Sequence, residues 1–338
     1  MITSQKFGKL ANGENIEKYI LKNDNDFEVS VLSYGLYIQK IIYPDGTDIV
    51  LGYDNLEQYI NDTYYLGCIV GRNANRLSGA SVIINEEEIK LSKNETTKQL
   101  HGGFEGFNKK NWKGEIIDNT LKLTYISEDG EEGYPGKVTV VCSFRLSNDN
   151  CLLMSYEATT NKDTVVNLTR HDYFNLSGYK AKDIKSHKVE INSNFYTAND
   201  INSIPTGEIL SSKGGILDFS NEREIETQLN TFAGKLPMGF DHNYSIDKPL
   251  NHLGFAAKTS FKNKSLEIET TQPGVQLYTA AYVENLKGKY GATYNPYAGL
   301  CLETQHFPDA TKNKHFPTTI LKKNTTYKHQ LIYKFVIS

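Results

Sequence analysis

Long apolar runs are missing from this sequence of 338 residues. No segment approaches the roughly 20 consecutive apolar residues that a helix needs to cross a bilayer, so we expect no membrane-spanning helix and no membrane partner. The first residues, Met1 to Gly8, lack the continuous apolar stretch of a secretory signal. We therefore expect the cytoplasm as the compartment.

Cysteine is scarce as well. The four cysteines occur singly, mostly among apolar neighbours as in Gly67-Cys68-Ile69-Val70, and none forms a Cys-x-x-Cys pair. We interpret them as reduced residues of the core and expect no disulfide framework. Because a His-Glu-x-x-His pattern is absent too, we expect no metal site. These four residues are Cys68, Cys142, Cys151 and Cys301.

A strong excess of charge of either sign is also missing. The sequence has 37 Lys and Arg against 40 Asp and Glu, a formal net charge of −3, so no global field attracts nucleic acid or an anionic membrane. The glycine-rich motifs that bind phosphates or dinucleotides are absent, as is the Gly-x-Ser-x-Gly motif of serine hydrolases. The function class that remains is acid/base chemistry on a small neutral ligand, and we expect no cofactor.

What the sequence does contain is alternation of apolar and polar residues in many short runs. In the clearest run, Val138, Val140, Cys142, Phe144 and Leu146 share one face, which is the period of a half-buried strand. Similar runs cover residues 27–34, 121–126, 151–158 and 266–270, and the closing run places Tyr327, Leu331, Tyr333, Phe335 and Ile337 on one face. Turn pairs such as Asp129-Gly130 separate the runs.

Helical periodicity is limited to residues 55–60 and 221–229. Many strands joined by polar turns, together with 22 Tyr and 15 Phe to fill flat interiors, predict a large all-β sandwich or barrel with few short helices. No internal repeat, low-complexity tract or proline-rich linker interrupts the chain. We therefore predict a single domain over residues 1–338.

Ionisable residues concentrate in five segments. In the first, residues 71–76, Asn75 and Arg76 have the side chains to bind hydroxyl groups of a ligand, but Arg72 or Arg76 can equally pair with a buried carboxylate inside the sheet. In the second, His101 precedes Gly102-Gly103, where backbone can approach closely, although such a group is commonly a simple turn.

The other three segments carry the groups best suited to proton transfer. His171 ends a strand-like run, and an imidazole there either exchanges protons near neutral pH or has a structural role. Asp241 can grip two adjacent hydroxyls or cap a turn. Glu303 lies between an apolar run and an aromatic turn, a place where its pKa is raised and a general base is favoured, unless it faces solvent on an edge strand.

Seven motifs, in order over essentially the full length, resemble the aldose 1-epimerase (galactose mutarotase) family. They are Gly-Arg-x-Ala-Asn-Arg at 71–76, Leu-His-Gly-Gly at 100–103, the segments 129–136, 171–176, 239–242 and 272–279, and Leu-Glu-Thr-Gln at 302–305. The resemblance implies a β-sandwich of the galactose mutarotase-like type. It also implies an enzyme, an isomerase acting on a small neutral aldose such as galactose or glucose, as a monomer or homodimer.

The family pattern assigns roles to individual residues. Glu303 aligns with the base and His171 with the acid that open the sugar ring and close it again to the other anomer. Substrate-binding positions of the family fall on Asn75, Arg76, His101, Tyr173, Asp241 and Gln276. The acid/base pair requires Glu303 ionised and His171 protonated at the same moment, which predicts a bell-shaped pH profile.

Some residues depart from the family pattern, and three rival functions stay open, the third of them outside the family. Ala280-Ala281 stands where many members have Gly-Asn, and Asn108 where Asp is usual, which leaves the preferred aldose open. A hexose-6-phosphate 1-epimerase would need a basic cluster near the motifs. A non-catalytic carbohydrate-binding protein would have lost the acid or the base, and a metal-dependent isomerase of the cupin type would need clustered His and Glu ligands.

Overall fold

The computed structural model describes residues 1–231 and 239–337. These residues form an all-β sandwich whose larger sheets are antiparallel throughout. The predicted fold class is confirmed. No helix in the described part of the chain is long and apolar enough to span a bilayer.

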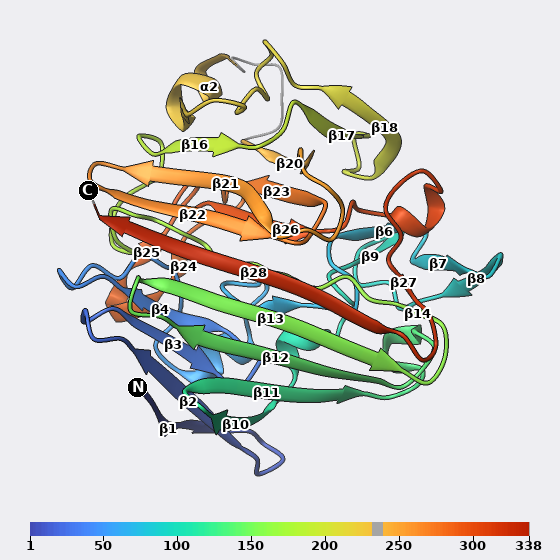
Figure 1. Ribbon diagram of the computed structural model, residues 1–338, viewed down its shortest axis with the longest axis horizontal. Coiled ribbons are helices and arrows are strands. Elements are labelled where there is room, and N and C mark those ends of the chain that lie inside the picture. Colours follow the sequence, from blue (N-terminus) through green and yellow to red (C-terminus); the bar gives the residue numbers. More distant parts are fainter. Residues whose placement is uncertain (232–238, 338) are drawn as a thin grey trace.

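The first layer is a nine-stranded sheet that faces the viewer in Figure 1, with the long strand β28 (red) across its middle. In sheet order its strands are β10 (Lys113–Ile117), β11 (Thr120–Ser127), β12 (Val138–Leu146), β13 (Cys151–Thr160), β28 (Thr326–Ile337), β22 (Lys264–Thr270), β21 (Gly254–Phe261), β16 (Lys188–Ile191) and β19 (Arg223–Glu224).

The second layer combines a five-stranded and a four-stranded sheet. The five-stranded sheet has the order β18 (Pro205–Ser211), β17 (Phe195–Asn199), β20 (Asp241–Ser245), β23 (Gly274–Tyr278) and β26 (Cys301–Gln305). The four-stranded sheet has the order β1 (Ile2–Lys9), β2 (Asn15–Lys22), β3 (Glu28–Leu32) and β4 (Ile38–Ile42).

Short elements complete the described fold. Two-stranded pairs join β5 (Ile69–Val70) with β15 (Thr169–Arg170), β6 (Arg76–Ser78) with β9 (Lys98–Leu100), β7 (Ser81–Ile84) with β8 (Glu87–Lys90), β14 (Thr164–Val165) with β27 (Ile320–Leu321), and β24 (Leu286–Lys287) with β25 (Thr293–Tyr294). The α-helices are α1 (Leu56–Ile60) and α2 (Ile225–Thr231), and the 3-10 helices are η1 (Phe107–Lys109), η2 (Glu131–Gly133), η3 (Lys289–Gly291) and η4 (Ala310–Lys312).

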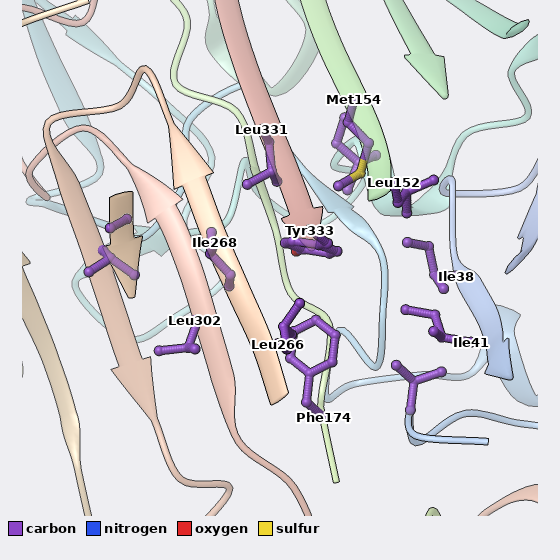
Figure 2. Packing of buried hydrophobic residues seen from close by; sticks show 14 of the residues in the cluster. Ile38, Ile41, Leu152, Met154, Phe174, Leu266, Ile268, Leu302, Leu331 and Tyr333 are labelled. Atoms are coloured by element: carbon purple, nitrogen blue, oxygen red, sulfur yellow. The ribbon is translucent and has the colours of Figure 1, made fainter. Parts of the chain in front are cut away.

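The hydrophobic core lies between the layers. Figure 2 shows Leu331 and Tyr333 of β28 facing the same interior as Leu302 of β26, and Ile38 and Ile41 of β4 bordering it. All five side chains are buried, and full burial of one such side chain contributes about 1.5–3 kcal/mol. This packing fixes β26, the strand that matters most for the site, against the nine-stranded sheet.

The predicted strand faces agree with the structure except at one end. Residues of β12 alternate between buried and more exposed as expected, and β28 buries Leu331, Tyr333 and Phe335. Ile337 continues the same alternation but is 45% exposed. It pairs with Lys264, where β22 begins, and so lies at the end of the strand pair.

The predictions for the helices and the cysteines also agree with the structure in most respects. Helix α1 begins after Asn55, whose side chain forms a capping box with Gln58. The second predicted helix starts later than expected, because Arg223 and Glu224 pair with β16 as β19. All four cysteines are free, as predicted, although Cys151 is only partly buried.

Candidate active site

A cavity of about 150 Å³ brings together most of the residues singled out in the sequence. This volume lies below the roughly 300–1,000 Å³ of pockets for drug-sized ligands, so it suits a single small molecule. Two larger hollows, of about 610 and 980 Å³, contain neither His171 nor Glu303. The small cavity is lined by Thr63, Tyr64, Tyr65, Asn75, Arg76, Leu100, His101, His171, Tyr173, Asp241, Tyr278, Tyr282 and Glu303.

Strand β26 presents Glu303 to this cavity because successive side chains of a strand point to opposite faces. Leu302 belongs to the core cluster, and the Thr304 hydroxyl lies 3.4 Å from the His329 Nε2 atom on β28. Glu303 therefore faces the other way, beside Gln276 of the neighbouring strand β23. Glu303 is 2% exposed and lies at the cavity wall.

His171 follows β15 and is held by its neighbours on both sides. Arg170 and Asp172 form a fully buried ion pair in which the Arg170 Nε and Nη2 atoms each lie 2.7 Å from an oxygen of Asp172. The backbone N–H of His171 donates to the Cys68 carbonyl oxygen at 3.0 Å. The side chains before and after His171 point into the protein, so the imidazole points into the cavity.

The two predicted catalytic groups meet there. The His171 Nε2 atom lies 3.5 Å from the Glu303 Oε1 atom. The other carboxyl oxygen, Oε2, is buried and has no hydrogen-bond partner among the residues that the structure describes. A buried polar atom without a partner is costly, and this one belongs to a residue that lines the cavity.

Burial shifts both groups toward their uncharged forms. It raises the pKa of Glu303 well above its usual value; the Asp241 carboxylate adds to the rise and Arg76 opposes it. Burial also lowers the pKa of His171 to about 4. Burial thus favours the arrangement with a proton on Glu303 and none on His171, whereas the roles expected from the sequence start with that proton on His171. Both arrangements contain the same number of protons.

The His101 segment packs against the Asn75 segment. The backbone N–H of Asn75 donates to the Nδ1 atom of His101 at 3.2 Å, which leaves the Nε2 atom of His101 for the cavity. Gly102 has φ +88°, and a Cβ there would lie 1.9 Å from the Gly71 carbonyl oxygen. The paired glycines thus allow the close approach that the sequence suggested.

The two arginines of the first segment have different roles. Arg72 is buried and donates to backbone carbonyls and to the Ser127 hydroxyl rather than to a carboxylate. Arg76 lines the cavity, with its Nε atom 3.2 Å from Glu95 and its Nη1 atom 3.9 Å from Asp241. Arg72 therefore has the structural role that the sequence left open, but its partners are carbonyl and hydroxyl oxygens and not a carboxylate.

Gln276 lies behind the cavity wall rather than in it. Its Nε2 atom donates to Asp241 at 2.6 Å, and its Oε1 atom accepts from the Asn75 side chain at 3.3 Å. It therefore orients two lining residues, and its predicted contact with substrate stays a prediction.

Aromatic side chains form much of the remaining wall, and the sequence analysis singled out only one of them. Tyr173 stacks on His171 with ring centroids 5.0 Å apart. Tyr65 lies 6.0 Å from His171 on a nearly parallel plane and meets His101 edge-on at 4.6 Å. Tyr278 meets His171 edge-on at 6.2 Å. Tyr65 directly precedes the apolar run 66–70, but β5 begins only at Ile69, so no strand-end pattern marks Tyr65 in the sequence.

Two imidazoles and a carboxyl group that converge in this way also resemble a metal-ligand set. His101, His171 and Glu303 each place one ligand atom within 4.8 Å of the others. Acid/base chemistry on a sugar needs no metal, and the expectation of no metal stays a prediction.

Known proteins are similar to this chain over its full length. Residues 17–334 match the family described as Aldose 1-epimerase. The chain is 37% identical to the galactose mutarotase of Bos taurus, with 100% of this chain and 99% of that protein covered. It is 28% identical to the aldose 1-epimerase of Escherichia coli K12, over 96% of each.

Among solved structures, the galactose 1-epimerase of Lactobacillus acidophilus superposes with a TM-score of 0.88. The two chains are 25% identical, and 100% of this chain and 99% of that one are covered. The chain is thus an isomerase of the class that acts on carbohydrates. It belongs to the aldose 1-epimerase family.

Proposed function

We propose that the chain interconverts the α and β anomers of free hexoses, galactose and glucose among them, with Glu303 as base and His171 as acid. The observation that carries the proposal is the 3.5 Å approach of the His171 Nε2 atom to the Glu303 Oε1 atom at the wall of a small cavity. The names of the relatives, galactose mutarotase and galactose 1-epimerase, support the choice of sugar.

In the proposed reaction, Glu303 takes the proton of the C1 hydroxyl while His171 gives a proton to the ring oxygen. The bond between C1 and the ring oxygen breaks, and the electron pair left on the C1 oxygen forms the aldehyde. Rotation about the C1–C2 bond presents the other carbonyl face. Ring closure with both proton transfers reversed then gives the opposite anomer, without net oxidation or hydrolysis.

The proton count of the buried pair fits this cycle. Ring opening starts with the proton on His171 and ends with a proton on Glu303. The second arrangement is the one that burial favours. A bound pyranose favours the first, because its C1 hydroxyl can donate to the unpaired Oε2 atom and its ring oxygen can accept from His171. The reaction thus alternates between two arrangements of one proton.

The cavity favours a neutral sugar over a phosphorylated one. Among the described residues that line it, Arg76 is the single Lys or Arg, and Glu95 and Asp241 lie beside its guanidinium. A phosphate group would need cationic donors that are free to bind it. The hexose-6-phosphate alternative has no such support, and the presence of both acid and base argues against a non-catalytic binding protein.

Polarimetry on freshly dissolved α-D-galactose and α-D-glucose tests the proposal. We expect the enzyme to accelerate the approach to anomeric equilibrium for both sugars. The 6-phosphates serve as the comparison, and we expect them to respond weakly. Equal or faster mutarotation of the phosphates would favour the alternative. No acceleration of any aldose would reject the proposal.

The remaining expectations concern the whole chain. We propose one domain over residues 1–338, because a single core cluster includes residues of all three larger sheets. We propose the cytoplasm as its compartment, since four free cysteines suit a reducing environment. Monomer and homodimer both stay open, and size-exclusion chromatography with light scattering distinguishes them.

A further inference from the structure

Cys301 lies directly behind the His171 imidazole. Its Sγ atom is 3.5 Å from the Nδ1 atom of His171, a distance within the range of hydrogen bonds to sulfur. Both residues are buried. The Nδ1 atom is the ring nitrogen on the far side from Glu303, which lies near Nε2. The imidazole therefore bridges two side chains of β26, Cys301 and Glu303.

The strand geometry makes this bridge a consequence of the fold. Residues two apart on a strand share a face, so Cys301 and Glu303 point the same way from β26. The register with β23 places Cys301 opposite Tyr278 and Glu303 opposite Gln276. His171, which follows β15, contacts both Cys301 and Glu303. Tyr173 stacks on its ring, with the ring centroids 5.0 Å apart.

The ring stack and the thiol restrain His171 in different ways. Stacking fixes the plane of the imidazole but leaves either nitrogen free to carry the proton of the neutral ring. A partner for Nδ1 decides between the two tautomers, because the tautomer depends on the hydrogen bond that the other nitrogen makes. Only the tautomer with hydrogen on Nδ1 leaves Nε2 bare and able to accept a proton.

We propose that Cys301 is a positioning residue whose sulfur accepts a hydrogen bond from the Nδ1–H group of His171 and so keeps Nε2 as the nitrogen that exchanges protons. The inference rests on the proposed acid role of His171. When His171 is protonated, Nδ1–H still donates to sulfur and the second proton sits on Nε2, next to Glu303 and the substrate. The same contact therefore serves both protonation states.

The choice of a thiol has a chemical consequence. Burial raises the pKa of the Cys301 thiol well above its usual value, and the nearby Glu303, Asp172 and Asp241 add to the rise, so the group is uncharged. A carboxylate at this place would stabilise the protonated ring and make it a poorer acid. A neutral, weak acceptor orients the ring without holding its proton.

The test combines NMR of the histidine ring nitrogens with kinetics on the full-length protein. In protein labelled with ¹⁵N-histidine, we expect His171 in the neutral state to show hydrogen on Nδ1; a His171→Gln sample identifies its signals. We expect Cys301→Ala to shift the ring toward the other tautomer, with little change in KM. By analogy with residues that orient metal-binding histidines, we expect kcat to fall by about tenfold to a hundredfold. Cys301→Ser, which keeps an acceptor, should restore the tautomer and most of kcat.

Cys142→Ala is the matched control. Cys142 is a buried cysteine of the core on β12, so its truncation leaves a similar void without touching His171. We expect a loss of thermal stability comparable to that of Cys301→Ala, with kcat unchanged. Circular dichroism and thermal melting show that each variant is folded.

The outcomes separate the inference from the proposed function. If His171→Gln loses turnover but Cys301→Ala keeps both the wild-type tautomer and kcat, the inference is wrong and the acid role stands. If His171→Gln keeps turnover, the proposed function itself fails, and with it the inference. A Cys301→Ser variant as impaired as Cys301→Ala would also overturn the inference, because an acceptor alone would then not suffice.

Discussion

Two buried pairs of ionisable residues lie side by side in this protein, and they are built in opposite ways. Arg170 and Asp172 make two contacts of 2.7 Å, and Asp172 also accepts from the Tyr333 hydroxyl at 3.0 Å. His171 and Glu303 approach only to 3.5 Å, and one carboxyl oxygen has no partner. The carboxylate of the first pair has hydrogen-bond partners for both oxygens, whereas the carboxyl group of the second pair does not among the described residues.

The pKa shifts differ in the same way. Burial alone would lower the pKa of Arg170, but the Asp172 carboxylate outweighs it and raises that pKa, so the guanidinium stays charged. For Glu303 and His171, burial favours the uncharged forms. A fully paired charge supports the backbone around the site, whereas an incompletely paired group can exchange a proton with a ligand.

Removing the unsatisfied carboxyl group should have the largest effect on activity. We expect Glu303→Gln to lower kcat by about 10²–10⁴, the usual contribution of a general base, while sugar binding and melting temperature stay close to the parent. Polarimetry, calorimetric titration with galactose and thermal melting measure the three quantities. Turnover within a few-fold of the parent would contradict the assignment of Glu303 as base.

Breaking the satisfied pair should instead affect stability. In Asp172→Asn the Arg170 charge stays buried without its counter-charge, and we expect the free energy of unfolding to fall by about 3–5 kcal/mol. Denaturant titration measures this fall. The control is Glu222→Gln, which removes an exposed partner of Lys188 and should cost less than about 1 kcal/mol. If Asp172→Asn were no less stable than the control, the contrast between the two pairs would be lost.

The sequence predicted more of the site than of its surroundings. Alternation of apolar and polar residues alone predicted strands such as β12. The family motifs pointed to Glu303 and His171. Both signals are local, because each is contained in a few consecutive residues. The contact of Cys301 with His171 joins residues 130 apart in the chain. No local pattern marks such a contact, so Cys301 was interpreted as an ordinary core residue.

Two further features also depend on the assembled fold. The folded sheets remove both groups of the acid/base pair from water, which raises the pKa of Glu303 and lowers that of His171; the motifs do not reveal these shifts. Gln276 was predicted to bind substrate, yet it stands behind Asn75 and Asp241. The position of Gln276 is set by how β23 pairs with β20 and with β26.

The pH dependence of kcat sharpens the comparison, since only the unsatisfied pair should titrate. The pair is active while it holds one proton. Below about pH 4, His171 takes up a second proton and the base is lost; on the alkaline side the single proton dissociates, at a pH above the usual glutamate value because the pKa of Glu303 is raised. We expect a bell-shaped profile of kcat with its acid limb well below 6.5. An acid limb at or above pH 6.5 would contradict the shift of His171.

The smallest effect is expected at the ring that stacks on His171. The Tyr173 hydroxyl donates to the Tyr64 carbonyl oxygen at 2.7 Å. In Tyr173→Phe the stack on His171 remains but this hydrogen bond is lost, at a cost of about 1 kcal/mol in the free energy of unfolding. Because Tyr64 and Tyr173 both line the cavity, we expect kcat to fall as well, by no more than about tenfold.

Tyr43→Phe provides the matched control for this last variant. Its hydroxyl donates to the Ser265 carbonyl oxygen at 3.2 Å, and Tyr43 belongs to the core rather than to the cavity. A similar loss of stability with unchanged kcat is expected. If both variants reduced kcat equally, the effect of Tyr173 would reflect general loosening of the fold. If only Tyr173→Phe did so, the hydrogen bond that anchors the Tyr173 ring to the Tyr64 carbonyl oxygen would be shown to matter for turnover.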